Sequence, residues 1–168
     1  MRKVITICIM FLILLLVIQT KAKTKRPEPT FEETGETMMR EHKVMLDRLI
    51  AAWEHRQEEI NLLAEVIYHE NWHTDKEHLA AYYTGAVVMN RVNSKAWPDT
   101  VKKVLYQKGQ YSTTKLFFTK EIPAECYEMA RDIYKNGTPD VPANVIFQAM
   151  RPLGKTWKKV NTDYFCYG

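Results

Sequence analysis

The sequence has little net charge of either sign, and it contains no repeats and no low-complexity tracts. Its 24 lysines and arginines stand against 20 aspartates and glutamates, which gives a formal net charge of +4. Residues 1–22 contain three of these bases (Arg2, Lys3 and Lys21) and no acid, so the rest of the chain has 21 bases against 20 acids, or +1. The chain therefore lacks the basic surface that is typical of nucleic-acid-binding proteins, and no nucleic acid partner is expected.

Cysteines are few as well, with three in 168 residues. Cys8 lies in an apolar run without the small residues that mark a lipoprotein site. Cys126 and Cys166 are the only two that would remain after export, and an oxidising compartment would allow them to pair. A disulfide needs Cα atoms within about 7 Å of each other, which the sequence does not reveal. A pair of buried free thiols is the alternative interpretation.

The apolar run near the N-terminus, Val4 to Ile18, has 15 residues. It is short for a membrane span, which needs about 20 residues. Charged residues precede it, and the small residues Thr20 and Ala22 follow it at the spacing of a cleavage site. This pattern predicts a signal peptide over residues 1–22, with an uncleaved membrane anchor as the alternative. The protein is therefore expected to be secreted or associated with the cell envelope, and to touch a membrane only if this segment stays uncleaved.

Residues 23–36 are interpreted as a linker, because they hold Pro27, Pro29 and Gly35 and few apolar residues. Residues 37–59 are predicted to form an amphipathic helix. Apolar side chains recur there at helical spacings and continue beyond it: Met38, Met45, Leu49, Trp53, Ile60, Leu63 and Ile67. We expect this stripe to pack on its own domain rather than to form a coiled coil, because it contains few heptads.

Residues 60–168 are predicted to form one mainly helical domain with a small antiparallel sheet, an α+β class. Thr74 and Glu77 fit a capping box for a helix that runs to about Val92. Further helices are expected after Thr100 and Pro123. The segments Val145–Phe147 and Tyr164–Tyr167 resemble two strands of one hairpin, with Lys155 to Asn161 connecting them.

The position of Glu70 follows from the apolar stripe. Three residues beyond Ile67, Glu70 falls on the buried side at the end of the helix. Burial disfavours the charged form of a carboxyl group and raises its pKa. A raised pKa suits a general acid that works near neutral pH. The alternative is a partly exposed glutamate without a role.

Residues 69–73, His-Glu-Asn-Trp-His, also match the H-E-x-x-H pattern of zinc peptidases. His69 and His73 would bind the metal and Glu70 would act on a zinc-bound water. Such a site needs a third protein ligand. His78 follows His73 without the glycine of the extended pattern, and residues 80–97 contain neither an acid nor a histidine. No metal is therefore expected, and a zinc peptidase is kept as an alternative.

A wider set of motifs carries a resemblance to a known family. They occur in this order: Leu62-Leu63-Ala64 with Ile67, Tyr68 and Glu70; Gly85 to Val92, which contains Asn90-Arg91-Val92; Trp97 to Val101; Val104 to Ser112, which contains Gly109-Gln110-Tyr111-Ser112; and Tyr164 to Tyr167. Together they resemble the SleB-type cell wall hydrolase family. Gln148-Ala149-Met150 stands where the family pattern has Asn-Pro.

The resemblance implies a lysozyme-like α+β domain that cuts the bond between N-acetylmuramic acid and N-acetylglucosamine in peptidoglycan. The family is similar to lytic transglycosylases, which use one glutamate and no cofactor, and Glu70 occupies the position of that glutamate. Tyr68, Gln110, Tyr111 and Ser112 are the candidate substrate-binding residues. The expected partner is the glycan strand of peptidoglycan, and the protein is expected to act as a monomer. A non-catalytic glycan-binding module is a further alternative.

Overall fold

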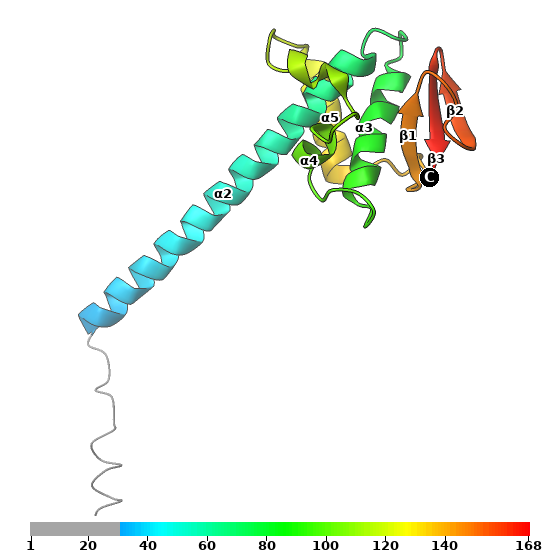
Figure 1. The fold of residues 1–168 in the computed structure, drawn as a ribbon. Coiled ribbons are helices and arrows are strands. Elements are labelled where there is room, and N and C mark those ends of the chain that lie inside the picture. Colours follow the sequence, from blue (N-terminus) through cyan, green and yellow to red (C-terminus); the bar gives the residue numbers. More distant parts are fainter. Residues whose placement is uncertain (1–30) are drawn as a thin grey trace, which may run out of the picture. The chain divides into compact units, whose positions relative to one another are not determined.

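The computed structural model describes residues 31–168, so the predicted signal peptide and residues 23–30 of the predicted linker lie outside the described residues. The elements are helices and strands in the order α2 (Phe31–Asn71), α3 (Leu79–Val92), α4 (Val101–Leu105), the 3-10 helix η1 (Ser112–Leu116), α5 (Ala124–Asn136), β1 (Val145–Ala149), β2 (Thr156–Val160) and β3 (Asp163–Tyr167) (Figure 1). The three strands form one antiparallel sheet. These elements confirm the predicted α+β class. Within residues 31–168, no helix is both long and apolar enough to cross a membrane.

Helix α2 starts earlier than the sequence predicts. It begins at Phe31, so residues 31–36 are helical and not part of a linker. The last proline before it is Pro29, so no proline after that position interrupts the helix. The chain divides into two units, residues 1–48 and 49–168, and α2 contributes to both.

Within the second unit, the expected packing of the stripe is wrong for Leu49 and Trp53 and is confirmed for Ile60, Leu63 and Ile67. Leu49 and Trp53 are 57% and 60% exposed, so these turns do not pack on the domain. Burial begins at Glu59 and Ile60 and continues through Ile67. Only the turns of α2 from Ile60 onward carry side chains that pack into the buried core of the second unit.

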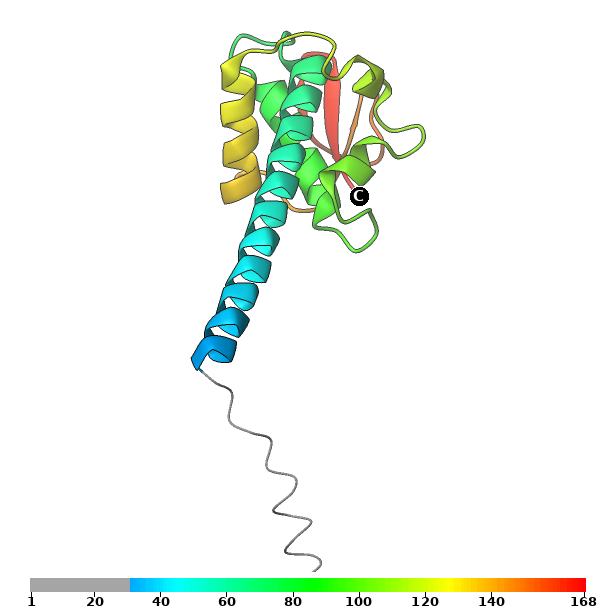
Figure 2. The same ribbon diagram turned by 90° about the vertical axis from the view of Figure 1, so that its left-hand side faces the viewer.

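Helix α3 is the centre of the second unit: it lies between the other helices and the sheet (Figure 1), partly behind α2 in the view of Figure 2. It packs through two opposite faces. One face, with Ala81 and Val88, joins the core that α2, α4 and α5 share. The other face, with Tyr83 and Val87, packs on the sheet. Gly85 permits this close packing, because a Cβ atom there would lie 2.7 Å from the Cδ1 atom of Ile133. The apolar residues of α3 thus hold the sheet and the helices together.

The sheet has the order β1-β3-β2, which corrects the predicted hairpin. The predicted strands do pair, since Ala149 lies opposite Tyr164 in an antiparallel register. The segment predicted as their connection instead forms β2, with Val160 opposite Asp163. Asn161 has a φ of 50°, which asparagine tolerates better than most residues, so a tight turn joins β2 to β3. The sequence pattern missed β2 because most of its residues are exposed.

The helix caps agree with the sequence in one case and differ in another. The Thr100 side chain accepts a hydrogen bond from the Lys103 N–H and caps α4, as predicted. The capping box at Thr74 and Glu77 is wrong, because α3 begins only at Leu79. Its first N–H groups donate to the carboxylate of Asp75 instead, from Leu79 at 2.7 Å and from Ala80 at 3.1 Å.

Cys126 and Cys166 are buried free thiols. The structure therefore agrees with the interpretation of two free thiols and not with a disulfide. Burial raises the pKa of the Cys126 thiol to about 12.

Glu59 links α2 to the start of α4, and its removal gives a first testable prediction. The buried carboxylate accepts hydrogen bonds from the N–H groups of Val101 (2.7 Å) and Lys102 (3.2 Å). The substitution Glu59→Ala leaves these donors without their acceptor and should lower the free energy of unfolding by about 2 kcal/mol, measured by urea denaturation. Glu58→Ala is the matched control, because Glu58 is exposed and pairs only with the exposed Lys102 ammonium. Equal losses in both variants would contradict the capping role.

Candidate active site

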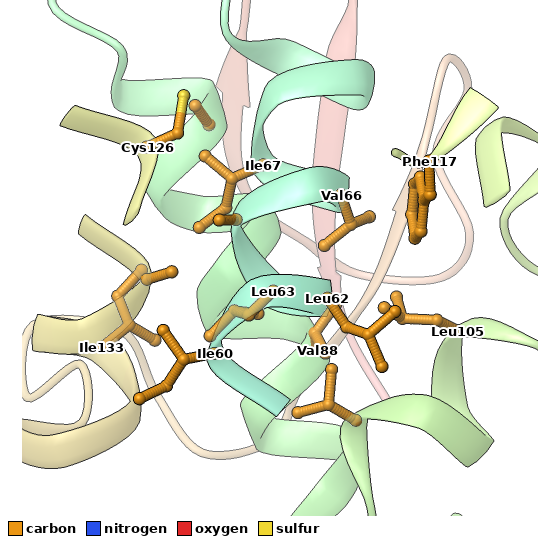
Figure 3. Close-up of a cluster of buried hydrophobic side chains, with 14 of the residues drawn as sticks. Ile60, Leu62, Leu63, Val66, Ile67, Val88, Leu105, Phe117, Cys126 and Ile133 are labelled. Atoms are coloured by element: carbon orange, nitrogen blue, oxygen red, sulfur yellow. The ribbon is translucent and has the colours of Figure 1, made fainter. Parts of the chain in front are cut away.

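The C-terminal end of α2 places Glu70 beside the core. Leu63, Val66 and Ile67 are fully buried and point into the cluster drawn in Figure 3. Glu70 follows one turn later and is half-buried. The hydroxyl of Thr113, in η1, donates a hydrogen bond to Glu70 Oε1 at 2.5 Å. The apolar packing of α2 therefore determines where this carboxyl group lies.

Glu70 opens into a cavity of about 290 Å³. Its walls come from the helices and from the sheet. The helical side consists of the end of α2, α3 and the segment before η1, and the sheet side consists of β1, the residue after it, and β3. The lining residues are Glu70, Arg91, Gln110, Tyr111, Gln148, Ala149, Met150 and Asp163. The wall thus combines a carboxyl pair with amide, phenol and guanidinium groups, which can hydrogen-bond a polar ligand.

The environment of Glu70 raises its pKa above the ordinary value for a glutamate. Burial is the largest cause, and the negative charge of Asp163 adds to it. The hydrogen bond from Thr113 and the nearby His69 act in the opposite direction, because both favour the charged carboxylate. The net effect favours a protonated Glu70, as the position on the buried stripe predicted.

Asp163 is the second carboxyl group of the cavity, and the side chains of β1 and the end of α2 hold it. In the orientation of the Asn71 amide that gives both its oxygen and its nitrogen suitable partners, the nitrogen donates to Asp163 Oδ2 at 3.2 Å and the oxygen accepts from Gln148 Nε2 at 2.7 Å. Gln148 and Thr162 also hydrogen-bond the Asp163 carboxylate. Burial raises the pKa of Asp163, and the hydrogen bonds from Gln148 and Thr162 oppose this.

Arg91 organises another part of the cavity wall. It is 4% exposed, and its Nε donates to the carbonyl oxygen of Ile146 in β1 at 2.8 Å. Its Nη1 donates to Gln110 Oε1 at 3.0 Å, and the guanidinium lies over the Trp97 ring, 4.4 Å from its centroid. Burial raises the pKa of the neighbouring Tyr111 to about 12, so its phenol stays neutral. Arg91 thus fastens the Gln110–Tyr111 segment to the sheet.

The family model described as Cell Wall Hydrolase matches residues 75–165, which is more than half of the chain. The chain belongs to this family. It is therefore an enzyme that acts on peptidoglycan, and a cell wall hydrolase domain of this kind indicates a role outside the cytoplasm. This confirms the resemblance that the motifs carried. The match begins five residues after Glu70, so it does not cover that residue. No curated protein and no solved structure matches the chain.

In this cell wall hydrolase, the structure brings together some of the predicted site residues. Glu70, Gln110 and Tyr111 line the same cavity. Ser112 is exposed at the start of η1 and does not line it. Tyr68 also lies elsewhere, because it is on a different face of α2: its ring contacts His73, and the Lys120 ammonium lies 4.7 Å from its centroid.

Sequence reasoning missed three polar residues around Glu70 in this hydrolase: Thr113, Gln148 and Asp163. Thr113 follows the Gly109–Ser112 motif directly, so its proximity to the motif was an available signal. Gln148 and Asp163 become neighbours only when β1 pairs with β3, which no local pattern indicates. Their contribution depends on the tertiary structure.

The geometry of the H-E-x-x-H segment does not suit a zinc site. Helix α2 ends at Asn71, so His73 lies beyond it and is exposed. His69 faces Glu65 instead, with Nε2 3.3 Å from its carboxylate, and stacks on Phe117. In the described part of the chain, no three histidine, cysteine, aspartate or glutamate side chains are grouped as metal ligands. His69 thus contacts Glu65 and Phe117, and His73 contacts the ring of Tyr68.

Proposed function

We propose that this enzyme cleaves the glycan strand of peptidoglycan between N-acetylmuramic acid and N-acetylglucosamine as an exported lytic transglycosylase. Glu70 is its general acid and then its base. The observation that carries the proposal is a half-buried carboxyl group with a raised pKa that opens into a polar cavity. A raised pKa favours the protonated form, which a general acid needs in order to give its proton to a leaving oxygen.

One carboxyl group suffices for the reaction. Glu70 gives its proton to the glycosidic oxygen as the bond between that oxygen and C1 of the muramic acid breaks. The Glu70 carboxylate then takes the proton of the muramyl 6-hydroxyl as that oxygen bonds to C1 and closes a 1,6-anhydro ring. Glu70 ends protonated, as it began, and no water is consumed. Gln110 and Tyr111, which line the same cavity, supply hydrogen-bonding groups for the sugars.

Hydrolysis of the same bond is the second candidate, and Asp163 favours it. Hydrolytic glycosidases use two carboxyl groups, one of which activates a water or attacks the sugar. Asp163 lines the cavity with Glu70, so a second carboxyl group is at hand. The two candidates differ in the product: transglycosylation leaves an anhydro end, and hydrolysis leaves a reducing end.

The test is incubation of the purified full-length chain with purified peptidoglycan in the presence of a metal chelator. Released glycan fragments, detected by mass spectrometry, are the expected result. Release of peptide fragments only after zinc is added would instead support a zinc peptidase. Binding to insoluble peptidoglycan without any released fragment would support a glycan-binding module and would contradict the proposal.

A further inference from the structure

We propose that Asp163 is the ionised partner of Glu70, and that its negative charge keeps the Glu70 carboxyl group protonated until the proton passes to the glycosidic oxygen. This inference deepens the proposed function and rests on it for the identity of the acid. It assigns to Asp163 a positioning role, since Asp163 acts on the reaction through the protonation of Glu70.

The first support is where Asp163 lies. It is the first residue of β3, directly after the tight turn from β2, and it lines the same cavity as Glu70. Asn71, the residue next to Glu70 at the end of α2, donates a hydrogen bond to Asp163 Oδ2 at 3.2 Å. The strand that carries Asp163 is thus tied to the helix end that carries Glu70.

The second support is that the donors around Asp163 favour its charged form. Gln148, on β1, and Thr162, on the turn, hydrogen-bond the carboxylate, as Asn71 does. Donors that face a carboxylate stabilise its negative charge. Glu70 has the Thr113 hydroxyl as its donor. Asp163 therefore faces three hydrogen-bond donors where Glu70 faces one, and this difference assigns the charge to Asp163, although burial raises the pKa of both groups.

The other groups near Glu70 do not supply the negative charge that Asp163 supplies. His69, on α2, favours the charged form of Glu70, and the buried Tyr111 phenol is neutral. The Arg91 guanidinium lines the cavity too; its positive charge would favour the charged form of Glu70, but its donors bond the Ile146 carbonyl and Gln110 Oε1 and not Glu70. Burial is the largest cause of the raised pKa of Glu70, and Asp163 is the negative charge in the cavity that adds to it. When two carboxyl groups share a site, the one with the higher pKa acts as the acid.

Two substitutions should move the pKa of Glu70 in opposite directions. Asp163→Asn removes the negative charge and keeps the size of the side chain, so the pKa of Glu70 should fall. Thr113→Val removes the hydrogen bond to the charged form, so the pKa of Glu70 should rise. A general acid loses activity as pH rises through its pKa. The alkaline limb of the profile of kcat/KM against pH should therefore shift to lower pH in Asp163→Asn and to higher pH in Thr113→Val.

The experiment measures this profile on soluble glycan strands for the full-length chain and the two variants, with Asp163→Glu as the variant that keeps the charge. The limb of Asp163→Glu is expected to stay closer to that of the unsubstituted enzyme than the limb of Asp163→Asn. A uniform loss of activity in Asp163→Asn, with no shift of the limb, would show a purely structural role and would overturn the inference.

A second readout separates this inference from the proposed function. The titration of the Glu70 carboxyl carbon, followed by NMR in the same proteins, needs no activity. If the enzyme releases no glycan fragment, the proposed function fails, while a lower pKa of Glu70 in Asp163→Asn still supports the pairing. An unchanged titration of Glu70 in Asp163→Asn would overturn the pairing even in an active enzyme.

Discussion

Glu70→Gln is expected to lower the rate of glycan cleavage by about 100-fold or more, the usual contribution of a general acid. Glutamine keeps the shape of the side chain and can still accept the hydrogen bond from Thr113, but it has no proton to give to the glycosidic oxygen. The fold should survive, because Glu70 is only half-buried and lies at the end of α2. The measurement is the rate of fragment release from purified peptidoglycan.

Glu77→Gln is the matched control for this substitution. Glu77 is an exposed carboxylate in the turn between α2 and α3, and it does not line the cavity. Its activity should equal that of the unsubstituted enzyme. Full cleavage by Glu70→Gln would remove Glu70 from the reaction. An equal loss in both variants would mean that the assay responds to net charge and not to the acid.

Arg91→Ala is expected to reduce both stability and activity. The buried guanidinium donates to Ile146 O and Gln110 Oε1, and the substitution leaves both acceptors without their donor. Hydrogen bonds from a charged donor contribute about 1.5–3 kcal/mol each, so we expect the free energy of unfolding to fall by about 3 kcal/mol. Because Gln110 then loses its attachment to the sheet, kcat/KM at a temperature where the variant is folded should fall as well. Urea denaturation and the cleavage assay measure the two effects.

Two control substitutions separate the effect of the Arg91 hydrogen-bond geometry from the effect of its positive charge. Arg91→Lys keeps the positive charge but not the planar fork, so it should recover only part of the stability. Lys95→Ala removes an exposed positive charge just beyond α3 and should change neither property. Full stability in Arg91→Ala would contradict the role of Arg91 in joining the Gln110–Tyr111 segment to β1.

Local patterns in the sequence were sufficient to predict most of the helical core. The spacing of Ile60, Leu63 and Ile67 predicted the buried face of α2 and, by extension, the half-buried position of Glu70. Thr100 was recognised as a cap because capping is a contact within four residues. Gln110 and Tyr111 were predicted as site residues from the Gly109–Ser112 motif and not from any apolar pattern, and both line the cavity.

The features that the sequence did not reveal depend on contacts between distant residues. Asp163 becomes the neighbour of the α2 end only after β3 pairs with β1. Strand β2 is mostly exposed, so no buried face marks it, and its pairing with β3 follows from the turn at Asn161. The capping box at Thr74 was overridden because Asp75 offers a carboxylate to two N–H groups.

If one carboxyl group, Glu70, acts first as acid and then as base on the glycan strand, the sugar ends that the enzyme releases should show it. The measurement is the mass of the sugar ends that the full-length enzyme releases from purified peptidoglycan in chelator. We expect ends in 1,6-anhydro-muramic acid, one water lighter than reducing ends, and their loss in Glu70→Gln. Reducing ends alone would contradict this expectation and would make Asp163 the second carboxyl group of a hydrolase.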